Sequence, residues 1–225
     1  MKIGVLVTGH PPDTMMEGGS YDRYFDRLLQ GNGFDVQGWA VVDGVFPDSV
    51  HDADGWLITG SKHGAYEPHD WIPPLETFIR TAFAAKVPMI GVCFGHQIIA
   101  QAMGGTVAKF DKGWSVGLTD YEMDGRRVAI NAWHQDQVIT RPEGAQVFAH
   151  NRFCENAGLI YDDVIWTIQP HPEYDSDFIQ GLIETRGTGI VPDTLLAAAR
   201  DRLDLPSDRM DVAQIMADFF RKERA

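Results

Sequence analysis

The pattern of apolar and polar residues along the first 105 positions predicts alternating strands and helices. Near-continuous apolar runs are typical of parallel strands that are buried on both faces. The expected strands are Lys2–Thr8, Phe34–Val42, Trp56–Thr59 and Met89–Val92. Apolar residues at helical spacing lie between and after these runs. The expected helices are Tyr21–Gln30, a segment opened by Pro73 and Pro74, and a segment that starts at Phe94 and is stopped by Gly104 and Gly105. This rhythm predicts an α/β fold with a mainly parallel central sheet flanked by helices.

The pattern changes after Thr106, where turn residues separate short apolar runs and no long helix intervenes. Such a pattern predicts antiparallel strands, here attached to the parallel sheet. The expected strands are Val107–Phe110, Ser115–Met123, Arg127–Ala132, Ala145–Asn151 and Val164–Gln169. The fold class is therefore α/β with an added antiparallel strand region.

Helical patterns return at the carboxyl end, first over about Asp175–Arg186 and then twice between Pro192 and Ala225. Glycines at 187 and 189 separate the first of these helices from the tail. We therefore expect a domain over residues 1–187 and a helical extension over 188–225 that packs on it. The apolar stripe of the last helix fits docking on the domain or a contact between protomers, so the oligomeric state stays open.

The composition limits the partners and the compartment. A formal charge of −13 argues against a nucleic-acid or anionic-membrane partner, because such surfaces attract basic patches. The two cysteines form no disulfide framework, which favours a reducing compartment. The run Met1–Val7 lacks a cleavable signal pattern, and no apolar run approaches the roughly 18 residues of a membrane span. We therefore expect a cytoplasmic protein.

Cys93 lies at the junction between an expected strand and an expected helix, in the sequence Gly91-Val-Cys-Phe-Gly95. This is the G-x-nucleophile-x-G pattern of a strand-to-helix elbow, with sulfur in place of the usual hydroxyl. Residues without Cβ relieve the crowding in such a turn. Free N–H groups at the helix start can hold an anionic intermediate and favour a thiolate. The pattern indicates a nucleophile, and the alternative is a buried structural cysteine.

A catalytic thiol needs a base, and the base needs a group that orients it. Among eight histidines, His171 is the strongest candidate because it lies at the end of an expected strand, between two prolines, with Glu173 two residues further on. Residues i and i+2 of an extended segment point to the same side, so the carboxylate can hold the imidazole. The other cysteine, Cys154, has no histidine nearby in the sequence, and we expect it to be inert.

The segments Gly91–Gln97 and Gln169–Glu173 together resemble the class I glutamine amidotransferases, the family with a Cys-His-Glu triad. The resemblance covers about residues 1–187. Weaker family motifs are Leu57–Ser61, Trp133–Asp136 and Phe153–Ala157. Within the family, the chain is similar to stand-alone members related to the amidotransferase half of GMP synthase and to γ-glutamyl peptidases. The resemblance implies a flavodoxin-like parallel sheet.

The resemblance also implies roles for individual residues. Cys93 attacks a γ-glutamyl carboxamide, His171 transfers protons and Glu173 orients the imidazole. The backbone N–H groups of Gly60 and Phe94 form the oxyanion hole. A γ-glutamyl thioester forms on the cysteine and is hydrolysed to glutamate. Residues that contact the amino-acid portion of the substrate are then Gln97, Trp133 and His134.

The chain departs from the family pattern at two positions. Pro170 precedes His171 where many members have Phe, and Trp133 replaces a small serine. A large ring at 133 either narrows the pocket or stacks on a substrate bulkier than glutamine, and a core or rim position for this ring is the alternative. We expect no metal, because the histidines His63, His69, His96 and His134 lack the HExxH or CxxC spacing of zinc sites. No nucleotide-binding motif is present, and we expect no cofactor.

Three functions follow from these features. The first is a self-sufficient hydrolase that cleaves glutamine or a small γ-glutamyl compound. The second is a glutaminase subunit that supplies ammonia to a separate synthase. The third is a catalytically inactive binding module that kept the fold. The first two share their chemistry and differ only in the partner.

Overall fold

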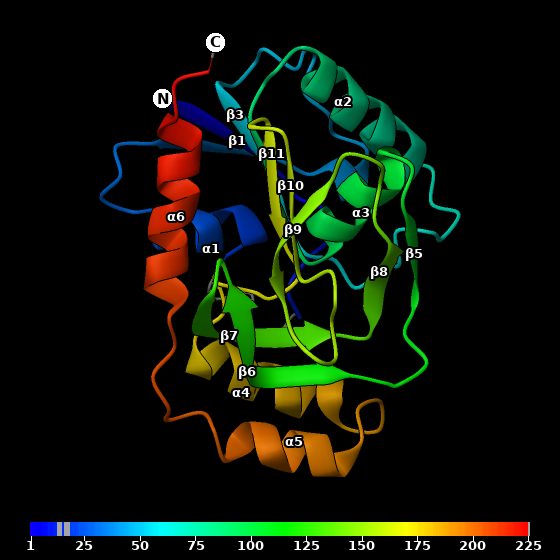
Figure 1. The fold of residues 1–225 in the computed structure, drawn as a ribbon, viewed down its shortest axis with the longest axis vertical. Coiled ribbons are helices and arrows are strands. Elements are labelled where there is room, and N and C mark those ends of the chain that lie inside the picture. Colours follow the sequence, from blue (N-terminus) through cyan, green and yellow to red (C-terminus); the bar gives the residue numbers. More distant parts are fainter. Residues whose placement is uncertain (13–14, 16–18, 225) are drawn as a thin grey trace.

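A mixed β-sheet runs through the molecule (Figure 1). The computed structural model describes residues 1–12, 15 and 19–224, and within them the nine strands of this sheet follow the order β2-β1-β3-β4-β11-β10-β9-β6-β7. The strands of the parallel half are β1 (Lys2–Leu6), β2 (Asp35–Trp39), β3 (Gly55–Ile58), β4 (Met89–Val92) and β11 (Ile165–Ile168). The mainly parallel sheet predicted from the sequence is therefore confirmed, and part of the irregular loop before Tyr21 lies outside the described residues.

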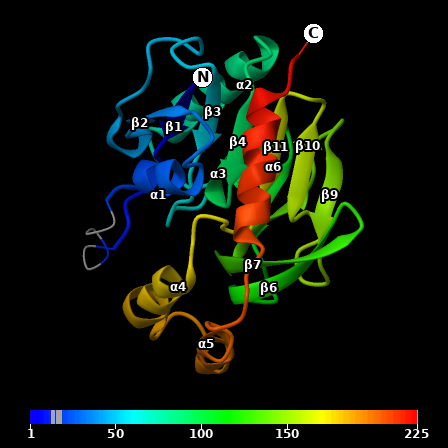
Figure 2. The ribbon, with the colours of Figure 1, turned by 90° about the vertical axis from the view of Figure 1, so that its left-hand side faces the viewer.

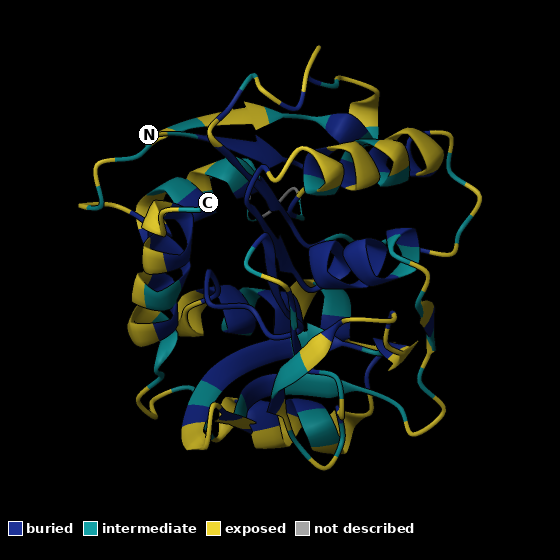
Figure 3. Ribbon diagram, turned by 45° about the horizontal axis from the view of Figure 1, so that its top comes forward, coloured by how far each residue is buried: buried dark blue, intermediate teal, exposed yellow. Residues whose placement is uncertain are grey.

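Helices cover both faces of the parallel half, which explains its continuous apolar strands. On one face lie α1 (Tyr21–Leu28), α4 (Ser176–Leu182) and α6 (Arg209–Arg221), whose apolar side chains share a core cluster with the strands. On the other face lie α2 (Ile72–Ala84) and α3 (Phe94–Ala102). Successive strand residues alternate between the two clusters, as pleating requires. Figure 3 shows the resulting buried interior between exposed outer helix faces.

The antiparallel half continues the same sheet beyond β11. It contains β10 (Gly158–Tyr161), β9 (Gln146–His150), β6 (Ser115–Met123) and β7 (Arg126–His134). The strands β5 (Thr106–Lys109) and β8 (Asp136–Thr140) form a separate antiparallel pair. The expected antiparallel region is present, but it was incompletely predicted because β8 and β10 were not recognised.

The assignment of residues 164–169 to the antiparallel region was only partly correct. Strand β11 pairs in parallel with β4 and in antiparallel with β10, so it joins the two halves of the sheet. The physical reason is that a strand has two edges, and the apolar sequence of β11 does not specify which neighbour each edge meets. This place in the sheet sets the carboxyl end of β11 beside that of β4.

The carboxyl-terminal segment lies against both halves of the sheet. Helix α4 continues as a π-helical turn over Ile183–Gly187, and α5 (Asp193–Arg200) packs near β6. Helix α6 lies along one face of the parallel half of the sheet (Figure 2). The ring of its Phe220 contacts that of Phe34 edge-on, with centroids 6.0 Å apart. Among the described residues, none of the helices combines the length and apolarity needed to cross a membrane.

Candidate active site

The joint between β4 and α3 holds Cys93 in a strained backbone conformation. Its φ is 53° and its ψ is −103°, which is uncommon for a residue with a side chain. The flanking glycines have no room for a Cβ: one on Gly91 would lie 2.6 Å from the carbonyl of Gly95, and one on Gly95 would lie 2.1 Å from the carbonyl oxygen of Ile58. The two glycines therefore allow α3 to press against the sheet and the elbow to turn sharply.

Cys93 and His171 meet at Gly60, which lies two residues after the end of β3. A Cβ on Gly60 would lie 2.9 Å from Cε1 of His171 and 3.8 Å from Cβ of Cys93. The thiol and the imidazole are both almost completely buried. Three adjacent strands, β3, β4 and β11, thus bring these residues together at their carboxyl ends, where ligands bind in open α/β sheets.

Glu173 holds the imidazole of His171 from the other side. Nδ1 of His171 lies 2.7 Å from Oε1 of Glu173, and both side chains are buried. Burial lowers the pKa of His171, but the negative charges of Glu173 and Cys93 outweigh this effect and raise the pKa to about 10. Because Nδ1 is engaged, Nε2 is the ring nitrogen left to exchange a proton with the thiol.

A turn, and not an extended strand, places His171 beside Glu173. The N–H of Tyr174 donates to the carbonyl of His171, which closes the turn. Asn131 of β7 clamps both ends, because its carbonyl accepts from the N–H of His171 at 2.8 Å and its Nδ2 donates to the carbonyl of Tyr174 at 3.0 Å. The Tyr174 ring stacks on the imidazole with centroids 3.9 Å apart. Sequence reasoning missed Asn131 and Tyr174, since no local pattern links them to the histidine.

The start of α3 offers a backbone N–H beside the thiol. Phe94 is the first residue of this helix, so its N–H has no intrahelical partner. The positive end of the helix adds to the attraction for an anion there. The backbone of Gly60 also lies close to the side chains of Cys93 and His171. This arrangement suits an oxyanion that develops on a carbonyl attacked by the sulfur.

A cavity of about 420 Å³ opens onto the thiol. Of the residues expected to form the site, Cys93, His171, Gln97, Trp133 and His134 line it. Gly60, Phe94 and Glu173 are not among the residues that line the cavity. The volume falls in the range of roughly 300–1,000 Å³ that is usual for small-molecule pockets.

Two polar residues of the cavity wall are hydrogen-bonded to other groups of the protein. The Nε2 group of Gln97 donates to the carbonyl of Asp136 at 2.9 Å and to Oε1 of Gln169 at 3.1 Å. Nδ1 of His134 lies 3.2 Å from the same carbonyl of Asp136. Burial lowers the pKa of His134 to about 3, so this ring is neutral at physiological pH. A substrate would therefore meet an uncharged imidazole and a fixed amide.

The cavity is also lined by charged and apolar side chains that sequence reasoning did not identify. Cationic side chains come from the loop after β3, from β5 and from the turn after α4, and they are Lys62, Lys109 and Arg186. Acidic side chains are Glu67 and Asp136, and bulky apolar or aromatic ones include Tyr21, Trp114 and Ile190. They come from segments far apart in the chain, so spacing in the sequence gives no signal for them.

The four histidines considered above as metal ligands lie in different environments. His63 and His69 both lie close to Glu67, and of these three residues His63 and Glu67 line the cavity. His96 is fully buried in α3, where its Nδ1 lies 2.8 Å from Oγ1 of Thr167. Burial lowers the pKa of His96 to about 3. Among these four, only the first pair, joined by a carboxylate, has the donor atoms of a metal site.

Cys154 has the environment of an inert thiol. It is buried and free, and burial raises its pKa to about 12. A thiol with such a pKa carries almost no thiolate at neutral pH, so it neither attacks carbonyl groups nor binds metals readily. The contrast with Cys93, which faces an imidazole and a cavity, leaves one candidate nucleophile among the two cysteines.

Comparison with known proteins gives a consistent set of relatives. The family model "Glutamine amidotransferase class-I" matches residues 43–180. "Gamma-glutamyl peptidase 4" of Arabidopsis thaliana is 33% identical over 182 residues, which cover 74% of this chain and 72% of the relative. A subunit of the glutamine-hydrolysing GMP synthase of Sulfolobus acidocaldarius is 35% identical over 183 residues, which cover 77% of this chain and 89% of the relative.

The solved structures agree on the fold. The crystal structure of a glutamine amidotransferase from Thermotoga maritima superimposes with a TM-score of 0.77 over 99% of both chains, at 17% sequence identity. That of a glutamine amidotransferase from Methylobacillus flagellatus gives a TM-score of 0.74 at 22% identity, covering 98% of this chain and 91% of the other. At these identities the similarity concerns the arrangement of strands and helices.

Proposed function

This chain belongs to the class-I glutamine amidotransferase family, and we propose that it is a hydrolase that cleaves the γ-glutamyl amide bond of a small γ-glutamyl compound. The observation that carries the proposal is the buried Cys93–His171–Glu173 arrangement at the carboxyl ends of three adjacent strands. The family membership supports a hydrolase in general, and these residues supply the chemistry. The reaction requires no cofactor.

In the proposed reaction, Nε2 of His171 takes the proton of the Cys93 thiol, the sulfur forms a bond to the γ-carbonyl carbon and the carbonyl electron pair moves to oxygen. The N–H groups of Gly60 and Phe94 stabilise this oxyanion. The C–N bond then breaks as Nε2 of His171 gives its proton to the departing amine, which leaves a γ-glutamyl thioester. Water attacks the thioester, His171 accepts a proton from it, and the C–S bond breaks to release glutamate.

Glu173 has a supporting role in this sequence. Its carboxylate, 2.7 Å from Nδ1, fixes the ring so that Nε2 faces the sulfur. It also stabilises the imidazolium that exists whenever the thiol is ionised. Although burial lowers the pKa of His171, the Glu173 carboxylate raises it, which makes the imidazole a stronger base toward the proton of the thiol.

The cavity favours a γ-glutamyl compound larger than glutamine. Its volume of about 420 Å³ suits a substrate with a sizeable group beyond the scissile amide. The cations Lys62, Lys109 and Arg186 offer partners for carboxylates of the glutamyl portion or of the leaving group. The oxygen of Gln97 can accept from the α-ammonium group. Trp133 offers a flat apolar face for the leaving group.

The second candidate function is a glutaminase subunit that supplies ammonia to a separate synthase. The 35% identity with the GMP synthase relative favours it. The chemistry at Cys93 is the same, but the substrate is glutamine and turnover depends on a partner. An inactive binding module is the third candidate, and the retention of all three triad residue types weighs against it.

Glutamate release by the purified chain distinguishes these functions. We expect rapid turnover of γ-glutamyl dipeptides and slow turnover of glutamine, each compared as kcat/KM. In Trp133→Ser, the preference for dipeptides over glutamine should fall by about tenfold or more, because one apolar contact is worth roughly 1–3 kcal/mol. Leu205→Ser, which alters an exposed residue away from the cavity, is the control.

Two other results would favour the alternatives. Weak glutamine hydrolysis that rises on addition of a synthase would support the subunit function. If neither substrate reacts and Cys93 resists alkylation by iodoacetamide at neutral pH, the chain is a binding module and the hydrolase proposal is wrong.

A further inference from the structure

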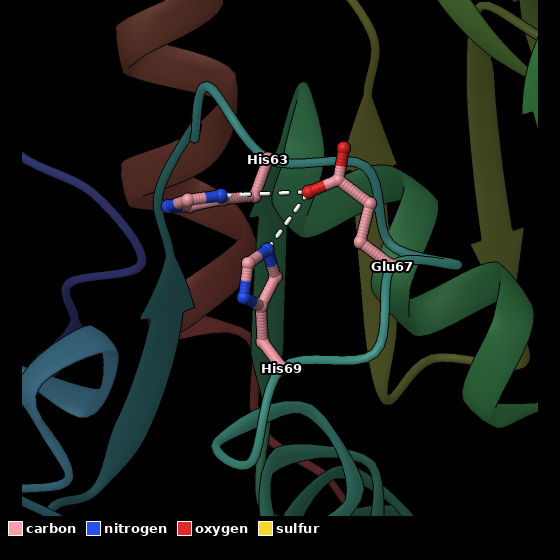
Figure 4. Close-up of side chains that lie close together, drawn as sticks. All are labelled: His63, Glu67 and His69. Carbon is pink, nitrogen blue, oxygen red and sulfur yellow. Dashed lines mark hydrogen bonds and ion pairs between the residues drawn. The ribbon is translucent and has the colours of Figure 1, made fainter.

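The loop between β3 and α2 gathers three side chains with metal-binding donor atoms at the rim of the cavity. Figure 4 shows the imidazoles of His63 and His69 directed at the same carboxylate oxygen of Glu67. Nε2 of His69 lies 2.8 Å from this Oε2 atom, and Nδ1 of His63 lies 3.5 Å from it. The three donor atoms all lie within 4.8 Å of one another.

These separations are close to those around a single ion. Zinc binds imidazole nitrogen at about 2.0–2.1 Å and carboxylate oxygen at about 2.0–2.2 Å. Donor atoms at these bond lengths in a tetrahedral site are on the order of 3.4 Å apart. Small side-chain rotations would therefore bring all three atoms to bonding distance. The sequence signal is His63-x₃-Glu67-x-His69, within one polar loop.

The surroundings permit an ion to enter. The side chains of His63, Glu67 and His69 are 22%, 41% and 33% exposed, so the donor atoms are neither sealed in the core nor freely mobile on the surface. Two of them, His63 and Glu67, also line the cavity. Two imidazoles and one carboxylate suit a first-row transition ion, whereas magnesium and calcium prefer oxygen ligands.

We propose that His63, Glu67 and His69 bind one divalent transition-metal ion of the zinc class at the mouth of the cavity. The ion takes the place of the imidazole–carboxylate hydrogen bonds and leaves a further coordination position for water. This site is separate from the proposed hydrolytic residues, and its existence does not depend on the proposed function.

Aromatic contacts connect the site to the elbow. The ring of His69 is parallel to that of Trp71 to within 14°, at 5.9 Å between centroids. The indole of Trp71 in turn packs against Phe94, the residue after Cys93, at 5.4 Å. Gly60 lies at the start of the same loop. A bound ion would therefore stiffen the loop that borders the nucleophile, which should raise the thermal unfolding midpoint.

The test uses cobalt(II) and zinc(II) with Cys93→Ala protein, because a thiolate next to His171 could itself bind these ions. After treatment with chelator and desalting, cobalt(II) titration should give visible absorption bands that saturate at one equivalent. Calorimetry with zinc(II) should give the same stoichiometry, and zinc(II) should raise the unfolding midpoint. All three readouts are independent of catalysis.

Glutamine substitutions separate metal binding from hydrogen bonding. His63→Gln and His69→Gln, each in the Cys93→Ala background, keep an N–H donor for Glu67 but lose the imidazole ligand. Each should weaken zinc(II) binding by at least about tenfold. Circular dichroism and the metal-free unfolding midpoint verify that each variant is folded. If His63→Gln does not fold, His69→Gln by itself decides the question.

His10→Gln is the matched control. His10 is an exposed imidazole whose Nε2 lies 3.1 Å from a carboxylate oxygen of Asp43, without a second histidine. This change should leave zinc(II) binding unaltered. The proposal is overturned if the Cys93→Ala protein binds no ion at micromolar zinc(II), or if binding persists unchanged in both glutamine variants.

Discussion

At the scale of single residues, the candidate chemistry depends on the few side chains that surround Cys93 and His171. The imidazole of His171 is fixed by Glu173 on one ring nitrogen, which leaves the other for proton transfer. Asn131 and Tyr174 hold the turn that carries both residues. The candidate nucleophile, base and orienting carboxylate could be proposed from the sequence because their motifs are local. The clamp was not, because Asn131 is 40 residues away from His171 in the chain.

Cys93→Ala should lower kcat/KM for γ-glutamyl hydrolysis by at least about a thousandfold, since members of a triad act as a unit. The measurement is glutamate release at saturating and subsaturating substrate. Cys154→Ala, which removes the other buried thiol, should keep near-normal rates. A Cys93→Ala protein with near-normal activity would show that another group is the nucleophile.

At the scale of secondary-structure elements, the strand–elbow–helix unit was predicted to within two residues, because its signals are all contiguous. The segment β4 has the predicted bounds, and α3 ends two residues before Gly104, the expected stop. By contrast, β8 begins two residues after β7 ends, and β10 has only four residues, starting with glycine. Both strands depend on pairing partners for their existence, and the glycine in β10 and the close junction of β8 with β7 weaken the signals of their own sequences.

Gly95→Ala should destabilise this unit strongly. A Cβ at this position would lie 2.1 Å from the carbonyl oxygen of Ile58, so helix and sheet would have to separate. We expect a loss of about 1–3 kcal/mol or more in the free energy of unfolding, measured by urea denaturation. Gly31→Ala is the control: it has open space but a φ of +85°, and backbone strain alone should cost about 1 kcal/mol. Equal losses in the two variants would contradict the close-packing explanation.

At the scale of the whole molecule, three buried histidines oppose one another in their response to pH. His96 and His134 are neutral in the folded state, because burial lowers each pKa to about 3. The raised pKa of His171 keeps this ring charged when folded. In the unfolded chain all three return to a pKa of about 6.5. His96 and His134 therefore reduce the stability of the fold below pH 6.5, and His171 reduces it above pH 6.5.

Below pH 6.5, His96 and His134 bind protons in the unfolded chain but not in the folded protein. Their contribution to stability is therefore lost as pH falls toward 3. The contribution of His171 is fully present below pH 6.5 and is lost as pH rises toward 10. Each group changes the free energy of unfolding by up to about 1.4 kcal/mol per pH unit. Urea denaturation at pH 5, 7 and 9 measures these slopes.

Two variants test which histidine causes each pH dependence of the free energy of unfolding. His171→Gln should show a smaller loss of stability than the wild type between pH 7 and 9. His96→Asn, which can keep a hydrogen bond to Thr167, should show a smaller loss between pH 5 and 7. Unchanged slopes in both variants would mean that other groups set the pH response.

The sequence alone predicted the parallel sheet, the elbow and the candidate residues Cys93, His171 and Glu173, because contiguous spacing encodes strands, turns and helices. Only the tertiary structure decided which strands are neighbours, and it set β11 between β4 and β10. It also decided which residues line the cavity, where Lys109, Arg186 and Ile190 come together from distant segments. Packing between segments far apart in the chain leaves no periodic trace in any one of them, so such convergence is visible only once the chain is folded.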